Sequence, residues 1–248
     1  MSKKIYLASI ISITFCFVGY SQSYNNGKVT YSVINNLKKI SKIEKDKNIP
    51  QEAKEKLLKI KNEASSLKYV LVFSGAESYF AKEKKIEQKK SFTEVLSGKG
   101  SYYTNLKNRK VFHSVDSFGE NFIINTPFRK WKLTQESKMI GKHKCYKAIT
   151  VKEVHTRSGI VKKNIIAWYT TSISVNFGLK DFSGLPGLII ELIDENVLFR
   201  ATKIELNLKN KIKIKKPISG KKVSIKEYNK IVKKMFYEFR KNRGRGEN

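Results

Sequence analysis

The sequence predicts a mainly β protein of the α+β class: an antiparallel curved sheet or half-barrel with an inserted N-terminal helix and a C-terminal amphipathic helix. Segments in which β-branched or aromatic residues alternate with polar residues recur between residues 28 and 214. Short turns separate these segments, which is typical of sequential antiparallel strands. A helical stripe of apolar residues follows after residue 224.

A first strand and a helical insertion are expected in the N-terminal part. Residues 28–34 alternate in part and predict the strand. Residues 37–66 are rich in Lys, Glu, Ala and Leu, and Pro50 is suited to the first turn of a helix. One helix, or two, is therefore predicted before a second strand at 68–73. The apolar residues at helical spacing are Ala53, Leu57, Ile60, Ala64 and Leu67.

The middle of the chain is expected to contain a charged loop and several short strands. The Lys-rich residues 82–90 predict a solvated loop or an exposed arm rather than core. Turns separate the short strands that follow. Those strands are expected around residues 102–103, 110–115, 121–124 and 131–134.

Two hairpins with longer strands are expected after residue 144. A turn at 157–159 joins the first pair of strands, and a turn at 194–196 joins the second pair. Alternation in the last strand continues over Ile212 and Ile214, which predicts one wet face and one buried face. The strands are expected at residues 145–153, 163–170, 188–193 and 199–208.

A capping box predicts where the C-terminal helix begins. Ser224 and Glu227 have the spacing of that motif. The apolar stripe of such a helix either packs onto the sheet or lies on an anionic membrane. The stripe consists of Ile225, Tyr228, Ile231, Val232, Met235, Phe236 and Phe239.

The composition is that of a folded, strongly basic protein. Of the 248 residues, 40% are hydrophobic and only 4 are Pro, which excludes collagen-like and disordered classes. The 51 Lys and Arg against 21 Asp and Glu give a net charge of +30. Neither a repeat nor a Gly/Ser linker divides the chain. We therefore expect a single domain over 22–240 and a polar tail over 241–248.

Residues 1–21 have the layout of a secretory signal peptide. Lys3 and Lys4 precede an apolar run over 7–18, and Gly19 and Ser21 are small residues before a cleavage site. The apolar run is shorter than the about 20 residues that a spanning helix needs. The sequence therefore predicts an exported protein, in the periplasm or at the outer membrane, without a transmembrane span after cleavage.

Residue patterns for catalysis or metal binding are scarce. Signal cleavage would remove Cys16 and leave Cys145 alone, either as a buried thiol or with a redox or intermolecular role. Three His residues and one Cys provide too few ligands for a zinc cluster, and no nucleophile elbow or phosphate loop is present. We interpret Asp181, Glu191 and Asp194 as solvated turn residues. No catalytic residue, metal site or cofactor is predicted.

Residues 184–189 read Gly-Leu-Pro-Gly-Leu-Ile, and matching segments lie upstream. Over about residues 68–206 the chain resembles the GLPGLI family of exported proteins from Bacteroidetes-type bacteria, with Leu179 where that family commonly has Pro. The resemblance implies an envelope protein, often encoded near TonB-dependent outer-membrane receptors, and implies no specific activity. It is carried by Gly184, Leu185, Pro186, Gly187, Leu188, Ile189, Trp168, Tyr169 and Cys145.

The six-residue motif also predicts a tight turn that enters a buried strand. Pro186 would supply a φ of about −65°, and Gly187 the positive φ of a type II turn. Gly184 would let the backbone pass close to a neighbour. The alternative interpretation is that the turn lines a ligand mouth or docks a partner.

These patterns favour a non-enzymatic binding, carrier or accessory protein of the envelope. An outer-membrane receptor is a suitable partner for such a protein. The alternative is an envelope enzyme with a carboxylate or Cys145 centre. The lysines either lie on solvated faces or attract an anionic envelope surface, and residues 209–222 form the best patch for this. A specific nucleic-acid partner is not expected, because no recognised module is present.

Overall fold

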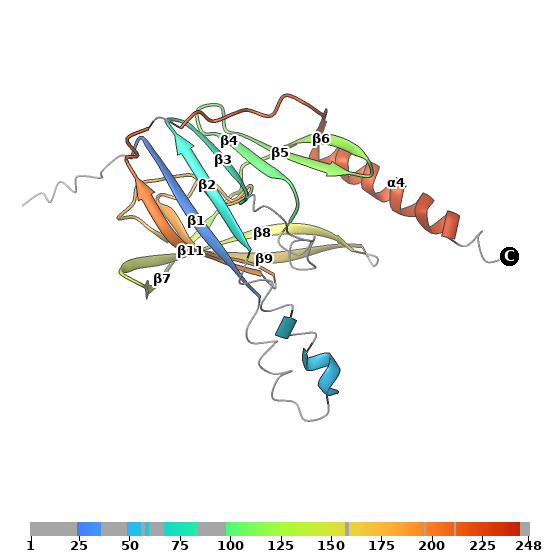
Figure 1. Ribbon diagram of the computed structural model, residues 1–248, viewed down its shortest axis with the longest axis horizontal. Coiled ribbons are helices and arrows are strands. Elements are labelled where there is room, and N and C mark those ends of the chain that lie inside the picture. Colours follow the sequence, from blue (N-terminus) through green and yellow to red (C-terminus); the bar gives the residue numbers. More distant parts are fainter. Residues whose placement is uncertain are drawn as a thin grey trace, which may run out of the picture.

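Twelve strands form one curved sheet in the computed structural model, which describes residues 24–35, 49–55, 58–59, 67–83, 98–156, 159–195, 197–210 and 212–243 (Figure 1). The order across the sheet is β12-β6-β5-β4-β3-β2-β1-β11-β10-β9-β8-β7. The elements are β1 (Asn26–Asn35), β2 (Lys68–Ser74), β3 (Glu77–Lys82), β4 (Ser101–Asn105), β5 (Lys110–Ser117), β6 (Glu120–Thr126), β7 (Lys132–Ile140), β8 (His143–Thr156), β9 (Gly159–Thr170), β10 (Leu188–Asp194), β11 (Val197–Leu206), β12 (Lys221–Ser224) and α4 (Ile225–Arg243).

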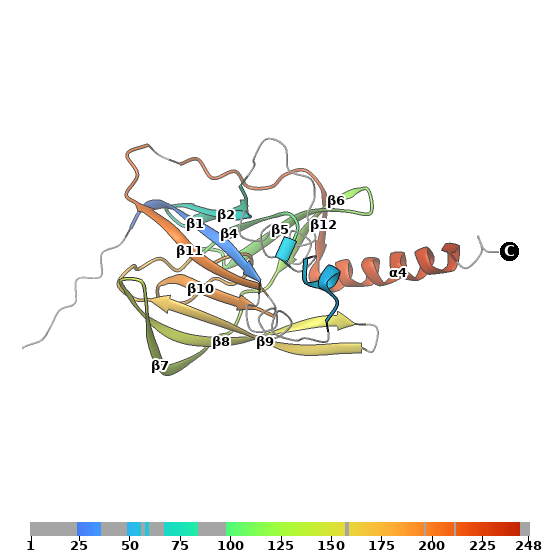
Figure 2. The same ribbon diagram turned by 60° about the horizontal axis from the view of Figure 1, so that its bottom comes forward.

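Antiparallel pairing and a curved shape agree with the predicted fold class. Every neighbouring pair is antiparallel except β12 and β6, which are parallel. Strand β1, from the start of the domain, lies between β2 and β11. It therefore joins strands β2–β6 and β12 on one side to strands β7–β11 on the other. Seen from two directions, strands β2–β6 curve over β8 and β9 (Figures 1 and 2).

Three strand predictions are incomplete or wrong. Strand β3 was not expected, because its hairpin turn has the inconspicuous residues Gly75 and Ala76, where Gly75 adopts a φ of 58°. Strand β11 ends at Leu206, followed by Asn207 with a φ of 52°, so the strand does not continue over residues 208–210 and 212–214. Residues 208–210 and 212–220 instead form a loop that leads to the unexpected parallel strand β12.

The inserted N-terminal helix is not supported as a long element. Within 37–66, helical conformation is described at 51–55 and 58–59, where the amides of Ala53 and Lys54 donate to the carbonyl of Pro50. The other residues of that prediction lie outside the described ones. The signal peptide at 1–21, the turn residues 157–158, most of the Lys-rich stretch at 84–90 and the tail from 244 also lie outside them.

The main core lies inside the curve of the sheet, around the loop that connects β9 to β10. In this loop Ile173, Val175, Phe177, Leu179, Phe182 and Leu185 are buried. Phe177 contacts Phe73 of β2 with ring centroids 5.7 Å apart, and Phe182 contacts Trp131 before β7 at 6.3 Å. A loop that reaches such distant strands occupies the interior that the sheet encloses.

Helix α4 packs onto the sheet through its first turns. The ring of Tyr228 lies 5.3 Å from the ring of Phe122, and its hydroxyl is 2.8 Å from the hydroxyl of Ser117. The capping box is confirmed: the amide of Glu227 donates to Ser224 Oγ, and the Ser224 amide donates to the Glu227 carboxylate. The rest of the helix extends beyond the sheet in both views (Figures 1 and 2). Among the described helices, none is both long and apolar enough to cross a membrane.

Candidate functional site

The two glycines of the motif have the opposite roles to those predicted. Gly187 does not have a positive φ, so the prediction of a type II turn there is wrong. A Cβ on Gly187 would lie 2.1 Å from the carbonyl oxygen of Thr170, so this position needs glycine for close approach. Gly184, in contrast, has a φ of 97°, in the region that favours glycine.

The other motif residues are part of the core. Leu185, Leu188 and Ile189 are buried, whereas Pro186 is exposed. The hydroxyl of Tyr31 donates to the carbonyl of Ile189 at 2.8 Å, and thereby ties β1 to the start of β10. These contacts support the structural interpretation of the motif as the return of the loop into a buried strand.

Trp168 and Cys145 lie beside a buried carboxylate. Glu191 of β10 is 2% exposed, and it accepts from Lys138 Nζ at 2.7 Å and from Arg200 Nε at 2.6 Å. The same Lys138 ammonium lies 4.4 Å from the centre of the Trp168 ring. We call these residues the Glu191 cluster.

The Cys145 thiol has no sign of activation. Its side chain is buried, and burial, followed by the nearby negative charge of Glu191, raises the pKa of the thiol to about 11. Its hydrogen-bond acceptor is the carbonyl of His143, 3.6 Å away, and not an imidazole. A thiol with such a pKa is protonated at neutral pH and is a poor nucleophile. Tyr169, also buried, packs near Tyr146 at 6.2 Å.

A second pair of acids is held by cations from distant parts of the chain. Asp194 accepts from Lys180 Nζ at 2.7 Å and from Lys152 Nζ at 2.6 Å, and all three side chains are mostly buried. Asp181 accepts from Arg129 Nε at 2.9 Å. We call these residues the Asp194 cluster. Glu191 and Asp194 are three positions apart on one strand, so the two clusters lie on opposite faces of the sheet.

The interpretation of Asp181, Glu191 and Asp194 as solvated turn acids is therefore wrong. Six of the seven residues of β10 are buried, which leaves both of its faces dry. Burial opposes ionisation of Asp194, but the ammonium groups of Lys180 and Lys152 outweigh it and lower the pKa of Asp194. The sequence did not reveal the partners, because they come from the loop, from β7, β8 and β11, and from the segment before β7.

His113 is held by packing and by a backbone carbonyl. His113 stacks on Tyr102 with ring centroids 4.2 Å apart, and its Nε2 lies 2.8 Å from the carbonyl of Lys99. Burial lowers the pKa of His113. Within the described ranges, no three His, Cys, Asp or Glu side chains gather as metal ligands. The buried charges Lys180, Asp181, Glu191 and Asp194 are all paired.

Exposed positive charge gathers instead near the C-terminus. Between residues 209 and 234 the chain contains one acid, Glu227, whose carboxylate is engaged in the capping box. We call this stretch the basic segment; it comprises the loop after residue 208, β12 and the first half of α4. Its exposed lysines are Lys209, Lys213, Lys215, Lys216, Lys221, Lys222, Lys226, Lys230, Lys233 and Lys234.

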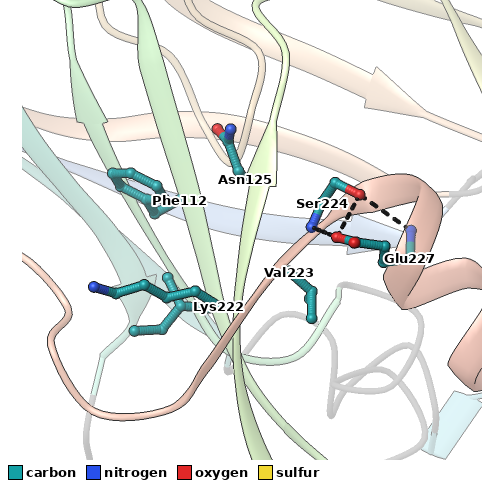
Figure 3. Close-up of a pocket in the computed structure, with 7 residues that line it drawn as sticks. Phe112, Asn125, Lys222, Val223, Ser224 and Glu227 are labelled. Atoms are coloured by element: carbon teal, nitrogen blue, oxygen red, sulfur yellow. Dashed lines mark hydrogen bonds between the residues drawn. The ribbon is translucent and has the colours of Figure 1, made fainter.

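A shallow depression lies where the basic segment meets β5 and β6. It has a volume of about 280 Å³, and Figure 3 shows Phe112 and Lys222 on one side of it, with Asn125 above them. The ammonium of Lys216 lies 5.6 Å from the centre of the Phe112 ring. A second depression, of about 510 Å³, lies between residues 127–132 and 149–151.

Comparisons with known proteins give little about activity. None of the curated proteins matches the chain. Two crystal structures of PNGF-II, in different space groups, match 83% and 84% of this chain at 15% and 16% identity, each with a TM-score of 0.49. The chain spans 32% of the length of these structures. Residues 156–191, which include the motif, match a family described as a protein of unknown function (Porph_ging); this match does not confirm the GLPGLI family by name.

Proposed function

We propose that the chain is an exported, non-enzymatic binding protein of the cell envelope, which attaches to an anionic surface through the basic segment. The observation that carries the proposal is the ten exposed lysines of that segment, against a single acid that is already engaged. Like charges crowded on one stretch repel one another in the free protein, and an anionic surface relieves that repulsion. Long-range attraction also raises the rate of encounter with such a surface.

The paired interior supports binding over catalysis. A carboxylate centre needs an acid with an adjustable proton, but Glu191 and Asp194 each accept from two cations. A Cys145 centre needs a thiolate, and burial raises the pKa of this thiol to about 11. As the structure describes them, Glu191, Asp194 and Cys145 do not favour the alternative of an envelope enzyme with a carboxylate or Cys145 centre.

Location and protein partner are proposed from the sequence. The N-terminal signal and the family resemblance favour export to the periplasm or the outer membrane, beside a TonB-dependent receptor. In this arrangement the basic segment holds the protein at the envelope, and the rest of the domain is free to contact the receptor.

Binding to isolated envelopes tests the proposal. The mature chain is mixed with envelope fragments of the source bacterium and sedimented at about 0.05 M and about 0.5 M NaCl. We expect it to sediment at low salt and to be released at high salt. A variant with Lys213, Lys215, Lys216, Lys221 and Lys222 changed to Gln should remain in the supernatant at both salt concentrations.

A matched control separates a functional patch from general basicity. It carries the same number of Lys→Gln changes at exposed lysines outside the basic segment: Lys107, Lys110, Lys130, Lys132 and Lys142. We expect this control to sediment like the unchanged protein. Equal loss of binding in both variants would mean that the charge acts only through its total, and would overturn the proposal.

A further inference from the structure

We propose that the anionic surface is a lipid leaflet, and that the loop before β12 inserts Ile218 between the phosphate headgroups. This inference rests on the proposed function and names its partner. Ile218 is 86% exposed, which is the highest value among the large hydrophobic side chains that the structure describes. An isoleucine as exposed as this one is unfavourable in water, and a membrane boundary offers it an apolar environment.

The loop holds this isoleucine on a fixed support. Pro217 restricts the backbone just before it. Two residues later Gly220 has a φ of 131°, and a Cβ there would lie 2.9 Å from the carbonyl oxygen of Asn121 in β6. Strand β12 then pairs with β6 from Lys221 onward. The tip is thus clamped against the sheet next to Ile218, which lowers the entropy cost of inserting it.

Cations flank the apolar tip on both sides. Lys215 and Lys216 precede it and Lys221 and Lys222 follow it, and all four are exposed. The position of Lys216 over Phe112 and the pairing of β12 with β6 hold the chain in place on both sides of the tip. An apolar residue surrounded by lysines matches a bilayer surface, where phosphates lie outside and acyl chains begin just below them. A soluble polyanion would use the lysines but would give the isoleucine no partner.

Helix α4 adds a second feature of membrane-surface proteins. It begins directly after β12 and extends past the sheet (Figure 2). Along the helix Tyr237 is 71% exposed, and Lys230, Lys233 and Lys234 are exposed, with Lys234 3.8 Å from the carboxylate of Glu238. Tyrosine is enriched at the headgroup level of membranes, and lysines interact with anionic lipids there.

Vesicle binding by matched isoleucine variants tests the inference. The mature chain is titrated with vesicles of phosphatidylcholine alone and with about 30% phosphatidylglycerol. We expect binding to the anionic vesicles only. Ile218→Ser should weaken this binding about tenfold, because one buried apolar side chain is lost. Ile160→Ser, at a 59% exposed position outside the basic segment, should leave it unchanged.

A probe at the tip reports insertion directly. Ile218→Cys can be labelled with an environment-sensitive dye, because Cys145 is buried. We expect the dye emission to shift to the blue with anionic vesicles and to stay unchanged with polyphosphate in solution.

Two negative results have different meanings. If Ile218→Ser binds anionic vesicles as tightly as the unchanged protein while the Lys→Gln variant of the basic segment does not bind, the partner is a polyanion recognised by charge alone. The lipid inference then fails and the proposed function stands. If the unchanged protein binds neither vesicles, nor polyphosphate, nor isolated envelopes, the proposed function itself fails.

Discussion

Single residues of the motif loop determine whether the chain can enter β10. At Gly187 the cause is space: a Cβ would overlap the carbonyl oxygen of Thr170 at 2.1 Å. We expect Gly187→Ala to lower the free energy of unfolding by about 2–3 kcal/mol, as overpacked sites do. Gly141→Ala is the control, because its φ of 57° is unfavourable for alanine but nothing lies within 4 Å.

Denaturant unfolding of the two variants checks this order. The control should lose about 1 kcal/mol, from backbone conformation alone. If Gly187→Ala were no less stable than Gly141→Ala, the close approach at Thr170 would not constrain the loop.

The Asp194 carboxylate gives the protein a defined sensitivity to acid. Its pKa in the folded chain is below the ordinary value of 3.8, so its contribution to stability is complete above that pH and is lost as the pH falls through the folded-state pKa. Asp194→Asn leaves Lys180 buried beside a neutral group. We expect it to lower the free energy of unfolding at pH 7 by about 3–5 kcal/mol, as the breaking of buried ion pairs does.

A pH series of denaturant unfolding curves checks both parts of the prediction for Asp194. The difference between the unchanged protein and Asp194→Asn should narrow below pH 3.8. A difference that stays constant over the acid range would show that Asp194 titrates as it does in the unfolded chain. Lys180→Met with Asp194→Leu removes both charges of the more buried pair and leaves Lys152 with Glu195 3.5 Å away, so it should recover much of the loss at neutral pH.

At the level of elements, α4 combines a packed beginning with an exposed end. Tyr228 packs on Phe122 and reaches Ser117, whereas Tyr237 is largely exposed on the same helix. We expect Tyr228→Ala to lower the free energy of unfolding by about 2–4 kcal/mol, because the ring contact with Phe122 is lost and the Ser117 hydroxyl loses its partner. Tyr237→Ala should change it by less than about 0.5 kcal/mol.

The two tyrosine variants also separate packing from membrane contact. Far-UV circular dichroism during denaturation measures the stability of each, and vesicle binding measures the function of the exposed end. If Tyr237→Ala destabilised the fold as much as Tyr228→Ala, the outer half of α4 would be part of the core and not a free surface.

Elements with strong local patterns were predictable from the sequence, and those that depend on distant partners were not. Strands β2, β8 and β10 have continuous apolar or alternating runs, and the capping box at Ser224 gives the start of α4 to the residue. The parallel strand β12 has only four residues, and its pairing with β6 is a tertiary contact. No local signal reports such a pairing.

The candidate site was harder to predict for the same reason. Asp194 looks like a turn acid in sequence because Glu195 and Asn196 follow it, and its two cations are 14 and 42 positions away. For Lys152 a weak indication exists. It lies two positions from Thr150 on β8, so its side chain points to the same face as that buried residue. The sequence predicts a patch of lysines around Ile218. That these lysines lie on a loop is known only from the structure, in which β11 ends at Leu206.

At the level of the whole molecule, the balance of charge should make stability depend on salt. The net charge of +30 destabilises the compact state by repulsion, mostly between exposed lysines, which salt screens well. The ion pairs of the Glu191 and Asp194 clusters are attractive. Their carboxylates are buried, while Lys138 and Arg200 are exposed, and salt screens such pairs less than it screens fully exposed charges. We therefore expect the free energy of unfolding to rise between about 0.02 M and about 0.3 M NaCl.

The basic segment should account for a large share of that salt response, because it concentrates ten exposed lysines in one stretch. The variant with Gln at Lys213, Lys215, Lys216, Lys221 and Lys222 should be more stable than the unchanged protein at low salt, and should gain less on adding NaCl. Five Lys→Gln changes at Lys107, Lys110, Lys130, Lys132 and Lys142 remove the same charge from scattered positions and should have a smaller effect. Urea is the denaturant for this comparison, because guanidinium chloride itself screens charge. If added salt lowered the stability of the unchanged protein, attraction within the ion-pair clusters would outweigh repulsion among the lysines. There would then be no net repulsion in the basic segment for an anionic surface to relieve.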